Sequence, residues 1–128
     1  MNKEHKQLIL KFFASIYPFS ELDPQLIVAE VWPRLTAQSF HEGDILKPYG
    51  TFGSELFIIC EGEVSIFSQV KDSANDILLN RYGEMEIIGE QNIQVKAHLS
   101  HKVVVTSKEV KVFAMFQKTF SQIFQVML

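Results

Sequence analysis

The chain has 128 residues, of which 47% are hydrophobic and 21% are charged, a composition that fits one folded globular domain and excludes a disordered chain. Its 12 basic and 15 acidic side chains give a net charge of −3, so it lacks the basic excess that nucleic-acid binding requires. The single cysteine, Cys60, excludes an internal disulfide and a multi-cysteine zinc site, and no apolar run is long enough to span a membrane. Because the N-terminus is too charged for a secretory signal, we expect a cytoplasmic protein without nucleic-acid or membrane partners.

Helical spacing dominates the first part of the chain, and we expect helices within about residues 3–34. Apolar side chains recur there on one helical face: Leu8, Ile9, Phe12, Phe13, Ile16 and Tyr17. Pro18 ends this helix. Asp23 and Pro24 then form an N-cap and first-turn proline pair that opens a second helix, which Pro33 ends or tightens.

The period changes after Gln38, and about eight short strands separated by turns are expected over about residues 38–114. The strands at 55–60 and 64–67 flank Glu61-Gly62, which predicts a two-residue hairpin turn. Helical spacing returns over about residues 117–128. This plan predicts an α+β, mainly β fold: an antiparallel double-stranded β-helix, or jelly-roll barrel, with N-terminal and C-terminal helices, in one domain over residues 1–128.

Several short motifs occur in the order and near the spacing of a known family. They are Phe40–Ile45, Gly50, Gly53–Ile59, Glu61–Val64, Tyr82–Gly83, Ile88–Glu90, Val110–Phe113 and Phe116–Phe120. Together they resemble the cyclic-nucleotide-binding domain family, which includes catabolite-activator-like regulators and kinase regulatory subunits, over about residues 8–125. The resemblance implies a regulatory domain: an eight-stranded jelly roll with flanking helices that holds cyclic AMP or cyclic GMP inside the barrel.

The resemblance also implies a phosphate-binding cassette that opens at Gly89 and Glu90 and continues through Gln91 and Asn92. Glu90 would accept a hydrogen bond from the ribose 2′-hydroxyl, and the backbone N–H groups of a short helix would face the cyclic phosphate. Family members place an arginine about nine residues after this glutamate. The matching positions here are Ser100, His101 and Lys102, and both arginines of the chain, Arg34 and Arg81, lie elsewhere. The cassette is therefore degenerate relative to the family.

The absence of this arginine favours one of two possible functions. A charge-assisted arginine–phosphate contact is worth about 1.5–3 kcal/mol, so its loss lowers affinity roughly tenfold to a hundredfold. We therefore expect a non-enzymatic regulatory or interaction module in which nucleotide binding is weak or lost. The alternative is a functional cyclic AMP or cyclic GMP sensor with a phosphate clamp that lacks arginine. Its positive charge would come from one of four side chains: Lys96, His98, His101 or Lys102.

The sequence predicts no cofactor, no metal site and no catalytic activity. His98 and His101 share one polar segment, but a barrel metal site needs a third ligand from a separate strand. Acidic side chains fall in turns and at strand ends without completing a catalytic set: Glu61, Glu63, Glu84, Glu86 and Glu90.

The C-terminal segment of the sequence is a candidate binding surface for a partner. The sequence stops at Leu128, and we expect neither a helix that would cap a bound base nor a DNA-reading helix-turn-helix. Apolar residues at helical spacing form a stripe there: Phe116, Phe120, Phe124 and Met127. This stripe either packs on the barrel or the first helix, or forms a docking face through which the C-terminal helix binds a protein partner or a second copy of the chain.

Overall fold

The N-terminal part of the chain is a layer of short helices. The computed structural model describes residues 2–49, 54–69, 75–89 and 101–125. Helix α1 (Lys3–Phe13) begins at Asn2, whose Oδ1 accepts the His5 N–H at 2.7 Å. After a 3₁₀ turn, η1 (Phe19–Glu21), Asp23 Oδ1 accepts the Gln25 N–H at 2.8 Å. That cap opens α2 (Pro24–Leu26), which continues as a π-helical segment, η2 (Ile27–Val31), and a 3₁₀ turn, η3 (Trp32–Arg34). The predicted helical region is confirmed, but α1 ends at Phe13 rather than at Pro18, and Leu8 and Tyr17 of the predicted apolar stripe are exposed.

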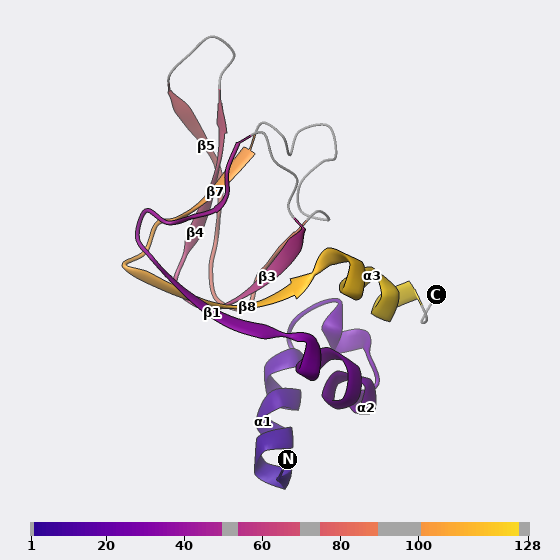
Figure 1. The fold of residues 1–128 in the computed structure, drawn as a ribbon. Helices are drawn as coiled ribbons and strands as arrows, with labels where there is room; N and C mark the ends of the chain where they lie inside the picture. Colours follow the sequence, from indigo (N-terminus) through magenta and orange to yellow (C-terminus); the bar gives the residue numbers. More distant parts are fainter. Residues whose placement is uncertain (1, 50–53, 70–74, 90–100, 126–128) are drawn as a thin grey trace.

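Eight strands follow in the described part of the chain and form two antiparallel four-stranded sheets. Figure 1 shows these sheets next to the helices. The first sheet has the order β1-β8-β3-β6: β1 (Thr36–His41), β8 (Glu109–Phe116), β3 (Glu55–Glu61) and β6 (Ile87–Ile88). The second has the order β2-β7-β4-β5: β2 (Ile45–Lys47), β7 (His101–Val105), β4 (Val64–Gln69) and β5 (Asp76–Tyr82). The chain returns to a helix in α3 (Gln117–Gln125). The mainly β fold with flanking helices is confirmed, and its strands begin at Thr36 and end at Phe116 rather than at 38 and 114.

The predicted hairpin between residues 55–60 and 64–67 is wrong. Strand β3 pairs with β6 and β8, whereas β4 pairs with β5 and β7, so the turn at Gly62 carries the chain from one sheet to the other. Gly62 has φ +95, and a Cβ there would overlap the backbone carbonyl of Glu109. A tight, two-residue spacing fixes a sharp reversal of direction, but it does not fix which strand each arm joins.

Two apolar cores hold these layers together. One lies between the two sheets: Ile59, Val64, Ile66, Ile88, Val103, Val105, Val110 and Val112 are all at most 4% exposed. The other joins the helical layer to the first sheet and contains Phe13, Phe19, Val31, Leu56 and Ile58, which are fully buried. Figure 1 shows the N-terminal helices and α3 side by side at one end of the sheets. The barrel interior is thus formed by the inner faces of both sheets, with the helices outside it.

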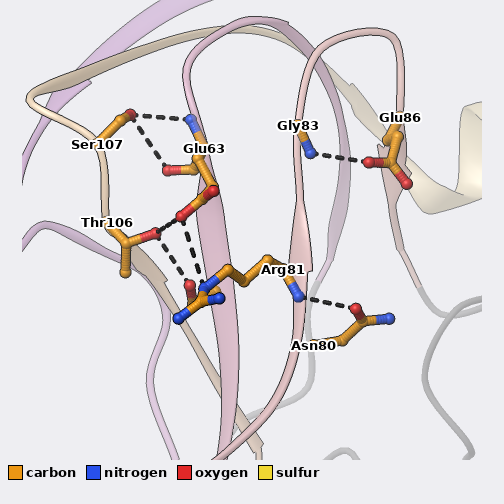
Figure 2. A network of polar contacts seen from close by, with 8 residues as sticks. Glu63, Asn80, Arg81, Gly83, Glu86, Thr106 and Ser107 are labelled. Carbon is orange, nitrogen blue, oxygen red and sulfur yellow. Dashed lines mark hydrogen bonds and ion pairs between the residues drawn. The ribbon is translucent and has the colours of Figure 1, made fainter.

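A polar network ties the β3–β4 turn to the β7–β8 turn (Figure 2). The Glu63 N–H donates to Ser107 Oγ at 2.8 Å, and the Thr106 hydroxyl donates to Glu63 Oε1 at 2.8 Å. Arg81 Nε on β5 lies 3.9 Å from the same carboxylate oxygen. Because the Glu63 backbone and side chain are both engaged, the network fixes the end of the barrel at which these turns meet.

Candidate functional site

Strand β7 carries two of the predicted cassette residues on opposite faces. Val103 and Val105 are buried between the sheets at 2% and 1% exposure. Since side chains alternate along a strand, His101 shares their inner face and Lys102 lies on the outer face. Adjacent residues in the sequence therefore have different access to the barrel interior.

Lys102 is engaged on that outer face by a polar cluster. Its Nζ lies 2.7 Å from Asp76 Oδ2, and the Tyr49 hydroxyl donates to Asp76 Oδ1 at 2.7 Å. The same ammonium stands 5.3 Å from the Tyr49 ring centroid and 5.9 Å from that of Phe67. Hydrogen bonds from Lys102 and Tyr49 hold the pKa of the Asp76 carboxyl below its usual value. This geometry does not favour a phosphate-binding role for Lys102.

Lys47 is a candidate that the sequence did not single out. Its side chain is 7% exposed, and its Nζ donates to the His101 carbonyl at 2.8 Å. Burial lowers the pKa of this ammonium. Simple alternation places Lys47 on the same face as Ile45, but a register irregularity between them leaves Ile45 51% exposed and Lys47 buried. No sequence signal marks that irregularity in a three-residue strand.

The other predicted site residues fall in two groups. Gly89 is described and buried, directly after β6. Glu90, Gln91, Asn92 and Ser100 lie outside the described residues, as do the alternative charge donors Lys96 and His98. The binding roles predicted for the cassette residues, including His101 and Lys102, therefore stay predictions.

Two of the carboxylates noted in the sequence support turns. Glu63 belongs to the network described above, and Glu86 Oε1 accepts the Gly83 N–H at 2.9 Å across the β5–β6 turn (Figure 2). Within the described ranges, no three histidine, cysteine or acidic side chains are gathered as metal ligands. The predictions of no metal and no catalysis stay predictions.

The C-terminal helix uses most of its aromatic stripe inside the molecule. The rings of Phe120 and Phe124 lie 5.8 Å and 5.4 Å, centroid to centroid, from the buried ring of Phe19. Phe116, at the end of β8, is 62% exposed, and Met127 lies outside the described residues. Phe120 and Phe124 therefore pack inside the domain, with ring contacts to the 3₁₀ turn η1, which the prediction of packing on the barrel or the first helix did not name.

The family model for the cyclic nucleotide-binding domain matches residues 37–126. The chain belongs to the cyclic nucleotide-binding domain family. This match covers both sheets and α3, and it confirms the resemblance of the sequence motifs. No curated protein sequence shows significant similarity to the chain. None of the helices in the described part of the chain is long and apolar enough to cross a membrane.

Solved structures share the fold of this cyclic-nucleotide-binding domain at low identity. The regulatory domain of Toxoplasma gondii protein kinase A with cyclic AMP superposes with a TM-score of 0.77 at 16% identity, covering 96% of this chain and 46% of that one. The regulatory subunit of a cyclic AMP-independent protein kinase A from Trypanosoma cruzi, bound to guanosine, gives 0.79 at 20%, covering 95% and 42%.

A third structure is that of a substituted variant. It is the corresponding subunit from Trypanosoma brucei, a variant with three substitutions, one of them threonine to arginine, bound to cyclic AMP in its A site. It gives a TM-score of 0.77 at 22% identity, covering 97% of this chain and 46% of that one. The chain thus spans less than half the length of these kinase regulatory subunits.

Proposed function

We propose that the chain is a non-enzymatic regulatory or interaction module with the cyclic-nucleotide-binding fold, whose affinity for cyclic AMP and cyclic GMP is low or lost. The observation that carries the proposal is that the cassette lacks the arginine that would bind the phosphate. Ser100 and His101 stand where the family has arginine, and the neighbouring cation, Lys102, is bound to Asp76 on the outer face.

The physical reason is the cost of burying an anion. A cyclic phosphate carries one negative charge, and placing it inside a barrel lined by valine and isoleucine requires a cation or several N–H donors. A bidentate arginine supplies both charge and geometry, which lysine and neutral histidine do not reproduce. We therefore expect binding roughly tenfold to a hundredfold weaker than in an arginine-containing site.

The structural neighbours support this reading of the charge. One of them is described as cyclic AMP-independent and bound to guanosine, a nucleoside without phosphate. Another holds cyclic AMP as a variant into which arginine has been introduced. By analogy, this chain would keep the fold while binding a cyclic phosphate only weakly.

Calorimetric titration of the 128-residue chain with cyclic AMP, cyclic GMP and guanosine tests the proposal. We expect no saturable heat from either cyclic nucleotide at micromolar concentrations. A submicromolar dissociation constant for cyclic AMP or cyclic GMP would overturn the proposal in favour of the alternative, a functional sensor with a non-arginine clamp. The buried ammonium of Lys47 is the observation that favours that alternative.

We also propose that a protein partner or a second copy of the chain docks beside the C-terminal helix. Phe116, directly before α3, is 62% exposed and apolar. Sedimentation velocity over a range of concentrations tests the second-copy case: the wild-type chain should associate and Phe116→Ser should not. Identical, concentration-independent sedimentation of both proteins would leave only a different protein as the partner. A cytoplasmic location stays a prediction.

A further inference from the structure

The interior of the barrel contains one charge among the residues that the structure describes. Its lining is aliphatic. Two polar residues are buried in the described ranges: Ser65, at 1% exposure, alternates with the inward-facing Val64 and Ile66, whereas Lys47, at 7%, pairs with Val103. An ammonium that is removed from water carries a large desolvation cost, which lowers the pKa of Lys47. A buried cation in a ligand-binding fold therefore calls for a functional explanation.

The sheet geometry directs this side chain inward. Lys47 pairs with Val103 across the β2–β7 ladder, and paired residues of antiparallel strands project from the same face. Val103 lies in the core between the sheets, so Lys47 points there as well. Its Nζ reaches the His101 carbonyl at 2.8 Å and the Pro48 carbonyl at 3.5 Å. The ammonium is thus held at the first residue of β7.

We propose that Lys47 is the cation that meets the phosphate of a cyclic nucleotide, or a comparable monoanion, inside this barrel. This inference rests on the proposed function: it names the residue on which the remaining, weak affinity for an anionic ligand depends. Lysine acts as a point charge with three donors. A phosphate oxygen would take the place of one of the carbonyl acceptors that the ammonium has in Pro48 and His101. Lys102 serves no such purpose, because its charge is matched by Asp76 outside the barrel.

The test is a nuclear magnetic resonance titration of the full chain to millimolar ligand, with cyclic AMP and with adenosine as the ligand that lacks phosphate. Four proteins are compared: wild type, Lys47→Met, Lys47→Gln and Lys102→Met. Lys102→Met is the matched control, because it removes the same charge from the same strand pair on the opposite face. The dispersion of the amide spectrum reports whether each variant is folded.

We expect wild type to bind cyclic AMP more tightly than adenosine. Both Lys47 variants should lose cyclic AMP affinity by about tenfold or more, and Lys102→Met should stay within about twofold of wild type. Adenosine affinity should not change. The inference is overturned if the Lys47 variants keep their cyclic AMP affinity, if Lys47→Gln keeps it while Lys47→Met loses it, or if wild type does not prefer cyclic AMP over adenosine.

The wild-type comparison of the two ligands needs no variant, so a lack of preference for cyclic AMP overturns the inference even if a Lys47 substitution unfolds the chain. Failure of this inference and failure of the proposed function are separate results. A submicromolar wild-type affinity contradicts the proposed function and leaves the comparison of Lys47 with Lys102 intact. Unchanged affinity in the Lys47 variants contradicts the role of Lys47 and leaves weak binding in place.

Discussion

The contacts of one side chain can prevent it from acting in a binding site, as Lys102 shows through its contacts with Asp76 and Tyr49. The Lys102 ammonium is a candidate phosphate ligand by sequence position, yet strand alternation turns it outward and Asp76 binds it at 2.7 Å. Tyr49 completes the cluster through a second oxygen of that carboxylate. The cluster joins β5 and β7 of the second sheet to Tyr49, which follows β2 in the chain.

The Tyr49 phenol reports on this cluster. Partial burial, its hydrogen bond to Asp76 and the negative charge of Asp76 raise the pKa of Tyr49 to about 12. Asp76→Asn removes the charge, so the pKa of Tyr49 should fall toward the ordinary tyrosine value of about 10. The measurement is the pH titration of the tyrosine ring carbon signals, with Tyr49→Phe used to assign the signal. A wild-type Tyr49 that titrates near 10, or no change in Asp76→Asn, would contradict the arrangement.

At the scale of elements, the crossing between the sheets at Gly62 is the feature most sensitive to one added carbon. Gly62 has φ +95, and a Cβ there would overlap the Glu109 carbonyl oxygen and lie 2.8 Å from Ser107 Oγ. Gly62→Ala should therefore lower the free energy of unfolding by about 2–5 kcal/mol, from backbone strain and overpacking together.

Gly43→Ala is the matched control for that substitution. Gly43 has a similar φ of +90, but nothing lies within 4 Å of a Cβ at this position. Only the backbone term applies, so the expected loss is about 1–2 kcal/mol. Urea unfolding measures both variants. Equal losses for the two would show that the approach of the β3–β4 turn to the β7–β8 turn is not as close as described.

Features of the fold that depend on local contacts could be predicted from the sequence, whereas features that depend on contacts between distant segments could not. Proline, glycine and capping residues act locally, which is why the helices, the strands and their order could be predicted. The pairing of β3 and β4 could not, because it depends on contacts with β8 and β7, which lie far along the chain. The same limit applies to Lys47, whose burial follows from an irregularity in the ladder with β7.

For the whole molecule, the helical layer and α3 form one unit around Phe19. That side chain is fully buried and contacts the rings of Phe13, Phe120 and Phe124.

Phe19→Ala should destabilise the chain by about 3–5 kcal/mol, since it opens a cavity among three aromatic rings. Phe116→Ala removes the same atoms from a side chain that is 62% exposed, so its effect should stay within about 0.5 kcal/mol. Urea unfolding at a concentration where the chain is monomeric separates the two. A mild effect of Phe19→Ala would mean that the helical layer contributes little to the stability of the barrel.

The candidate site could be predicted from the sequence only in part. The motifs locate a cassette and show that its arginine is absent, because both are matters of residue identity. The facing directions of His101 and Lys102 and the burial of Lys47 depend on tertiary structure. The sequence therefore raised the question of the missing charge, and the structure added the residue that we propose as its source.

The central claim is that cyclic nucleotide affinity is limited by one missing arginine. Calorimetric titration of Ser100→Arg with cyclic AMP tests it most directly, with Ser39→Arg, an exposed position on β1, as the control that adds the same charge elsewhere. The account predicts affinity roughly tenfold to a hundredfold higher than wild type for Ser100→Arg, and no gain for Ser39→Arg. Submicromolar binding by the wild-type chain, or equal affinities for the wild type and Ser100→Arg, would contradict it.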